Sequence, residues 1–202
     1  MSDTPIQLSI NGLPRNGGRA VQERIRADGD GDIARPRYAT SVHWVSGYRT
    51  RTQVKSGAVL QGDEPSTYGG ADLGATPQEL LLAAIGNCLA ATYVGGLTAA
   101  GIEVRSLKID VSGRVDFRAA FGVVPGAPGF ERIQVQVALD ANAPQAQLDA
   151  LLARLLPTAP IPDTISRPVP LDVRIEHVES AEHVEDVEDV EHVDPVAQSR
   201  NA

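Results

Sequence analysis

The stretch that decides the fold runs from Thr76 to Cys88 and reads Thr-Pro-Gln-Glu-Leu-Leu-Leu-Ala-Ala-Ile-Gly-Asn-Cys. Its start has the marks of a helix N-terminus: a threonine that can cap, a proline suited to the first helical position, and Glu79 three residues after the threonine, as a capping box requires. The residues that follow are apolar nearly all round, which is typical of a helix buried on several sides. We expect the helix to run to about Ala99 and to end at Gly101.

After this helix, residues 107–111 and 133–139 alternate apolar and polar residues, as half-exposed strands do, and the segment before it, 42–54, is rich in β-favouring residues. A second helix, with leucines on one face, is expected to open at Pro144, and five prolines follow it from Pro157 to Pro170. The order of strands, buried helix, strands, second helix and final strand is that of an α+β domain. The expected strands cover residues 42–54 (a hairpin turning at Ser46-Gly47), 58–61, 107–111, 133–139 and 169–175.

Composition divides the chain into three parts. Residues 1–36 are rich in Gly and Asp and read as a flexible, irregular arm, in which residues 19–27 could form a short helix. Residues 37–178 hold the domain. Residues 179–202 are an acidic, low-complexity tail, which we expect to be disordered because its charges repel one another.

The net charge of −8 belongs to the tail. Nine acidic residues and no Lys or Arg lie between Glu176 and Asp194, so the first 175 residues carry seventeen charges of each sign. No basic stripe suggests nucleic-acid binding. The first residues lack the basic and apolar regions of a secretory signal. Gly, Asn and Thr interrupt the apolar stretch Leu80–Ala100, so we expect no membrane span there. We therefore expect a soluble, cytoplasmic protein that binds neither nucleic acid nor membrane.

Cys88 is the only cysteine in 202 residues. No intramolecular disulfide and no cysteine-rich metal site can form, and any thiol chemistry must use this one atom. A structural alternative is that Cys88 is a small core residue, since free cysteines are among the most buried residue types. The Asp-Gly run over 28–32 lacks the spacing of a calcium loop, and we expect no metal and no cofactor.

Several segments together resemble the OsmC/Ohr superfamily of thiol-dependent hydroperoxide reductases and their OsmC-like relatives. The resemblance is carried by Asp63-Glu64-Pro65, Gly69-Gly70, the helix Pro77–Cys88 and the closing segment Asp163–Pro170. It implies an OsmC-like fold, in which a curved antiparallel sheet packs on a long central helix and a second helix. It also implies an intertwined homodimer with active sites at the subunit interface.

The resemblance also implies roles for particular residues. Cys88 matches the nucleophile that attacks the peroxide, and Arg49 or Arg51 matches an arginine that activates it. The glutamate that anchors this arginine in the peroxidases falls on Gln78, which is neutral, while Glu79 follows it and has a complete explanation in the capping box. The resolving cysteine of the typical enzymes is also missing, because Ala159 stands at its position.

Spacing adds an argument that does not depend on the family. Gln78 and Cys88 lie ten residues apart, which is about 15 Å along one helix. Neither Gln78 nor Glu79 can therefore reach the thiol of its own chain, whereas a partner's antiparallel helix could bring them together.

Two functions follow as hypotheses. The first is a homodimeric, single-cysteine organic hydroperoxide reductase, or redox-responsive protein, of oxidative stress defence that takes electrons from an external thiol. The second is a non-catalytic dimeric OsmC-like binding protein, which holds a small apolar molecule in a cavity at its interface. Gln78 and Ala159 both favour the second hypothesis.

Overall fold

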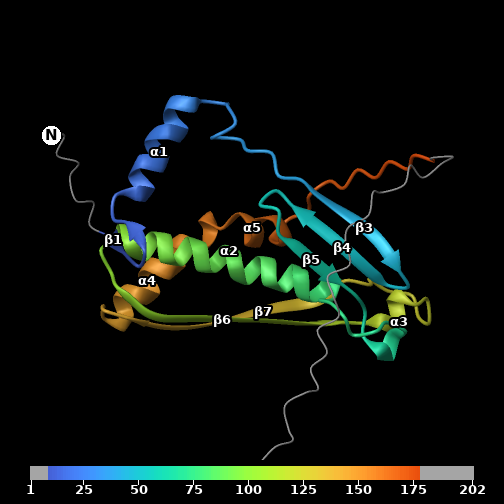
Figure 1. Ribbon diagram of the computed structural model, residues 1–202. Coiled ribbons are helices and arrows are strands. Elements are labelled where there is room, and N and C mark those ends of the chain that lie inside the picture. The colour runs from blue at the N-terminus through green and yellow to red at the C-terminus, as the bar shows by residue number, and fades with distance from the viewer. Residues whose placement is uncertain (1–8, 178–202) are drawn as a thin grey trace, which may run out of the picture. The chain divides into compact units, whose positions relative to one another are not determined.

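The computed structural model describes residues 9–177 of the chain (Figure 1). The chain divides into two units, Met1–Val169 and Pro170–Ala202. All helices and strands among the described residues belong to the first unit. They are β1 Ser9–Ile10, β2 Leu13–Pro14, α1 Gly17–Asp28, β3 Thr40–Ser46, β4 Arg49–Val54, β5 Val59–Gly62, the 3₁₀ turn η1 Ser66–Tyr68, α2 Pro77–Ala99, β6 Val104–Val115, α3 Phe117–Ala120, β7 Phe130–Ala141, α4 Gln145–Leu155, the 3₁₀ turn η2 Leu156–Thr158 and α5 Pro160–Ser166.

The strands are antiparallel, and the predicted α+β class is confirmed. β3 and β4 form the predicted hairpin, which turns at Gly47 with a φ of 55°, and β5 pairs with the other side of β4. β6 and β7 form a long two-stranded ribbon. The described strands make three separate sheets within one chain, where a single curved sheet was expected. Among the described residues no strand joins β3–β5 to β6–β7, so the outer edge of β3 is unpaired, and an unpaired edge can pair with another chain.

Helix α2 begins as the sequence predicts. Thr76 is its N-cap, the Thr76 hydroxyl accepts the Glu79 N–H, and the Glu79 carboxylate accepts the Thr76 N–H at 2.8 Å. The helix ends at Ala99, with Gly101 in the left-handed region at a φ of 74°. Figure 1 shows α2 lying along the β6–β7 ribbon.

The burial of α2 differs from the prediction. We expected burial on several sides, but within one chain the buried residues follow a single stripe, at spacings of about four residues. They are Ile85, Leu89, Tyr93, Leu97 and Thr98. The other side is exposed or half-exposed, because β6, α4 and α5 cover only one side of the helix. Leu81, for example, is 38% exposed.

α2 is also long and apolar enough to cross a membrane, with a mean hydropathy of 1.7. The polar interruptions noted in the sequence therefore do not exclude a span by length and composition alone. One stripe of α2 is nevertheless buried against the rest of the domain, and one such helix is weak evidence for a membrane span.

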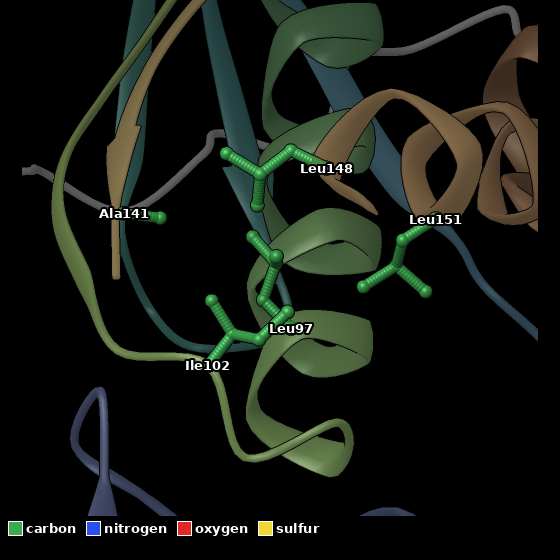
Figure 2. Packing of buried hydrophobic residues seen from close by; sticks show 5 residues of the cluster. All are labelled: Leu97, Ile102, Ala141, Leu148 and Leu151. Carbon is green, nitrogen blue, oxygen red and sulfur yellow. The ribbon is translucent and has the colours of Figure 1, made fainter. Parts of the chain in front are cut away.

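Two hydrophobic clusters lie along the buried stripe of α2. The first joins the end of α2 to β7 and α4 through Leu97, Ile102, Ala141, Leu148 and Leu151, whose side chains converge in Figure 2. The second lies nearer the middle of α2 and joins Ile85, Leu89 and Tyr93 to Ala159. Leu97 and Ala159 are fully buried. The second cluster positions the site described below.

The arm is partly regular. The short helix predicted over 19–27 is present as α1, whereas the strands β1 and β2 were not predicted. Between them, the Asn11 side chain donates to the Thr98 hydroxyl at 3.0 Å and to the Ile102 carbonyl at 3.0 Å, and it accepts the Val104 N–H at 2.8 Å. These bonds fix the start of the described chain to the end of α2. The flexibility of the arm and the domain bounds 37–178 remain predictions.

The C-terminal segment differs from the prediction in two places. Residues 160–166, for which no helix was predicted, form α5, since Pro160 occupies the first helical position, where proline is favourable. The strand predicted over 169–175 is absent. A strand needs a partner, and Pro168 and Pro170 supply no N–H for pairing. The predicted disordered tail, 179–202, lies outside the described residues.

Candidate functional site

Cys88 lies near the middle of α2 and is half-buried. It packs against the second cluster, which contains Ile85, Leu89, Tyr93 and Ala159. Partly buried aliphatic side chains from β6, β7, α4 and α5 complete these surroundings. Apolar surroundings disfavour a thiolate, so Cys88 needs polar partners if it is to react.

One polar partner comes from the start of α5. The Ile161 N–H donates a hydrogen bond to the Cys88 Sγ, with the nitrogen 3.4 Å from the sulfur. Ala159, where the typical enzymes carry the resolving cysteine, is fully buried in the same cluster. The segment Ala159–Ile161 therefore lies against the thiol, although it contributes no second thiol.

The two candidate arginines lie on β4. Arg51 stands opposite His43 on one side and Gln61 on the other, and Arg49 lies at the start of the strand opposite Ser46. The charge of Arg49 acts on Asp63. Among residues 9–177, the structure gives the Cys88 sulfur no contact with either arginine. One chain does not bring the predicted nucleophile and its predicted activator together.

Glu79 has the structural role that the sequence assigned to it. Its carboxylate accepts bonds from the main chain and the hydroxyl of Thr76, and these bonds hold its pKa below the ordinary value of 4.5. Gln78 is half-buried in the first turn of α2. Both residues lie at the N-terminal end of α2, far along the helix from Cys88, as the spacing of ten residues requires.

Asp63 is a buried acid whose structural role was not predicted from the sequence. Its side chain accepts the N–H groups of Glu64, Ala71 and Leu73, at 2.8, 3.1 and 3.1 Å, and the residue is 2% exposed. Burial raises its pKa, but the three main-chain bonds and the Arg49 charge outweigh burial and lower the pKa below 3.8. The usable signal was an aspartate directly before a glycine-rich loop, where side-chain oxygens commonly bond main-chain N–H groups.

Replacing Asp63 by Asn should lower the midpoint of thermal unfolding at pH 7 by about 5 to 10 °C, because an amide offers the three donors a weaker acceptor. The folded pKa is lowered, so the carboxylate stabilises the fold above its ordinary pKa, and this stabilisation is lost as the pH falls through the folded value. The difference in thermal midpoint between the wild type and Asp63→Asn should therefore shrink below pH 3.8. Scanning calorimetry at several pH values measures both effects.

Asp72→Asn is the matched control. Asp72 lies in the same loop, carries the same charge and is exposed, with one bond from the Ser66 N–H at 3.1 Å. Its midpoint should stay near that of the wild type. Equal midpoints for the two variants at pH 7 would contradict the role given to Asp63.

Two hollows of similar volume contain residues of the described domain. A groove of about 510 Å³ runs between α2 and β6 and is lined by Glu79, Leu82, Ala83, Gly86, Asn87, Ala90, Leu107, Ile109, Asp110 and Val111. A second hollow, of about 470 Å³, is lined in part by Tyr68, Phe117 and Phe121, whose rings contact one another. Cys88 lines neither hollow. No group of three or more His, Cys, Asp or Glu suited to a metal ion occurs among residues 9–177.

Comparison with known proteins identifies the fold. The chain is similar to the crystal structure of an OsmC like protein from Mycoplasma pneumoniae, with 15% identity, 65% of this chain and 89% of that chain covered, and a TM-score of 0.57. It is similar to a hypothetical protein from Aquifex aeolicus VF5, with 17% identity, coverages of 64% and 87%, and a TM-score of 0.52. At these identities the likeness shows the fold alone. No curated protein matches the chain.

The family follows from a second comparison. The model of the OsmC family, described as OsmC-like protein, matches residues 69–174, which is more than half of the chain. The match includes the whole of α2 with Cys88, the β6–β7 ribbon, α4 and α5. The predicted OsmC-like fold is thereby confirmed, and such a fold is a soluble domain. The chain belongs to the OsmC-like protein family.

Proposed function

We propose that the protein is a single-cysteine organic hydroperoxide reductase, or a redox-responsive relative of such enzymes, that works in the cytoplasm in oxidative stress defence. The proposal is carried by the placement of the sole thiol on the central helix of an OsmC-like domain, half-buried and with a main-chain N–H at its sulfur. The thiolate is the nucleophilic form of cysteine, and hydrogen bonds from N–H groups stabilise anions.

In the proposed reaction the Cys88 thiolate attacks the terminal oxygen of the hydroperoxide. The O–O bond breaks, the remainder of the peroxide takes up a proton and leaves as an alcohol, and the sulfur keeps the terminal oxygen as a sulfenic acid. An external thiol then gives a mixed disulfide and water. A second external thiol releases the Cys88 thiol and leaves as the external disulfide.

A homodimer is the proposed working form, because two apolar surfaces are uncovered in one chain. One is the exposed side of α2. The other is β3, which is exposed along its whole length and carries Trp44 and Val42, 73% and 60% exposed. Exposed apolar surface on this scale is typical of an interface. The outer edge of β3, which pairs with no other described strand, also favours pairing with a second copy.

The activating arginine is proposed to reach Cys88 from the second copy, since Arg49 and Arg51 do not contact the thiol of their own chain. Arg49→Ala and Arg51→Ala should differ in activity. Removal of the arginine that activates Cys88 should lower the rate of cumene hydroperoxide consumption by about 100-fold, and removal of the other should not. The assay supplies dithiothreitol as the external thiol and measures the remaining peroxide. Gln78 is proposed to hold the arginine by a neutral hydrogen bond.

Arg132→Ala is the control for these variants. Arg132 is an exposed arginine on β7, so its loss changes the net charge equally and should leave the rate unchanged. Wild-type rates in both Arg49→Ala and Arg51→Ala would contradict the proposal that an arginine activates Cys88.

A second function is favoured by one observation: Cys88 packs against the apolar cluster of Ile85, Leu89, Tyr93 and Ala159. A non-catalytic dimeric binding protein, holding a small apolar molecule at the interface, fits these surroundings. Native mass spectrometry of the purified dimer distinguishes the two functions. A co-purifying apolar ligand together with a thiol that does not react with hydroperoxide supports binding, whereas rapid trapping of a sulfenic acid by dimedone supports the reductase.

A further inference from the structure

The Cys88 sulfur lies close to one main-chain nitrogen. The Ile161 nitrogen is 3.4 Å from the sulfur, and its N–H points to it. Ile161 lies in the first turn of α5, where the N–H groups have no acceptor within the helix. Breaking the hydrogen bond from this N–H to the sulfur would therefore cost α5 none of its own hydrogen bonds.

The same place in the fold lacks a second thiol. Ala159 is fully buried beside Cys88, two residues before Ile161, and the sequence holds no other cysteine. The two lysines among residues 9–177, Lys55 and Lys108, lie on a turn and on β6, and Lys108 pairs with Asp110 at 2.9 Å. The nitrogen that the structure places at the sulfur is the amide of Ile161.

We propose that, after oxidation, Cys88 is resolved by the main-chain nitrogen of Ile161, which forms a sulfenamide with it. This inference rests on the proposed function, because a hydroperoxide must first convert Cys88 to the sulfenic acid. The nitrogen then attacks the sulfur, an S–N bond forms, and the S–O bond breaks. The hydroxyl leaves with the amide hydrogen as water, so the sulfur keeps its oxidation level.

The sulfenamide would take the place of the disulfide that a resolving thiol forms with the oxidised cysteine. It removes the sulfenic acid before a second peroxide can oxidise it irreversibly to the sulfinic acid. It is also reversible: an external thiol attacks the sulfur, the S–N bond breaks, and the nitrogen regains its proton. The mixed disulfide formed is the one that the proposed reductase cycle already contains.

Mass spectrometry of the whole protein tests the proposal. The full chain is treated with one equivalent of cumene hydroperoxide without reductant and then digested with trypsin. The expected product is lighter than the thiol form by two hydrogens, and a linked pair of peptides should join Ser56–Arg105 to Leu155–Arg174 through Cys88 and Ile161. Dithiothreitol should restore the thiol mass and separate the peptides.

Two variants of Ile161 make the test specific. Ile161→Pro removes the N–H, and proline is tolerated in the first turn of a helix, so this variant should give no linked peptides and should accumulate the dimedone-reactive sulfenic acid. Ile161→Val keeps the N–H and a branched side chain, and it should form the link as the wild type does. Equal yields of the link in both variants would overturn the assignment to Ile161.

The outcomes separate this inference from the proposed function. A thiol that stays unoxidised overturns both. A sulfenic or sulfinic acid without linked peptides, or a disulfide between the Cys88 residues of two copies, overturns the sulfenamide and leaves the oxidation of Cys88 by hydroperoxide intact. Linked peptides that appear in the wild type and in Ile161→Val, and not in Ile161→Pro, support the proposal.

Discussion

Cys88→Ser should reduce the consumption of cumene hydroperoxide in the presence of dithiothreitol to the rate of the buffer with reductant alone. The expected loss is at least about 100-fold, because a serine hydroxyl is not ionised near neutral pH and cannot accept the peroxide oxygen as sulfur does. Cys88 is the only thiol of the chain, so no other residue can replace it. The measurement is the initial rate of peroxide loss at equal protein concentration.

The substitution also controls for folding. A serine oxygen can accept the Ile161 N–H that the sulfur accepts at 3.4 Å, and Cys88 is only half-buried, so the thermal midpoint should change little. A variant that folds and has lost the activity assigns the chemistry to the thiol. Equal rates for the variant and the wild type would show that the chain consumes peroxide by other means or not at all.

Gly70→Ala should have the largest effect on stability among simple glycine substitutions. A Cβ at Gly70 would overlap the main chain of Glu64, which has no flexible end that could move aside. The Gly70 N–H also donates to the Pro65 carbonyl at 3.0 Å, within the loop organised by Asp63. The expected cost is about 3 kcal/mol in the free energy of unfolding, measured by urea denaturation.

Gly95→Ala is the matched control for this prediction. A Cβ at Gly95 meets no atom within 4 Å, and Gly95 lies inside α2. Alanine there should stabilise the protein by about 0.5 to 1 kcal/mol, because glycine loses more conformational entropy in a helix. A Gly70→Ala protein with the same urea midpoint as the wild type would show that the loop before α2 is not fixed as the structure has it.

Features set by neighbouring residues could be predicted from the sequence. The start of α2 depends on Thr76, Pro77 and Glu79, which lie within one turn of one another, and the capping box is present as predicted. The β6–β7 ribbon follows from alternation along each strand, although both strands are longer than their apolar cores indicate. Local spacing determines these elements, so no knowledge of distant contacts was needed.

Features that depend on distant partners could not be predicted in this way. The strand expected over 169–175 had the right alternation, but alternation does not supply an edge to pair with. The burial of α2 on one side depends on how many elements one chain places around it. Asp63 is buried because the loop up to Leu73 folds back over it. Composition alone does not predict this loop conformation.

The candidate site was predictable in part. The sequence singled out Cys88 and the missing thiol at Ala159, and the structure places these two residues in one cluster. The hydrogen bond from Ile161 was not foreseen, because no helix was predicted in the segment with five prolines. The roles of Arg49, Arg51 and Gln78 remain predictions, since they require contacts that one chain does not make.

The central claim is that the folded protein makes Cys88 reactive toward hydroperoxides. The most direct measurement is the second-order rate of Cys88 oxidation by cumene hydroperoxide, followed by thiol titration in the native protein and in the same protein unfolded in urea. The account predicts a native rate at least about 100-fold above the unfolded one, because only the fold can stabilise the thiolate. A native thiol that reacts no faster than the unfolded one would contradict it.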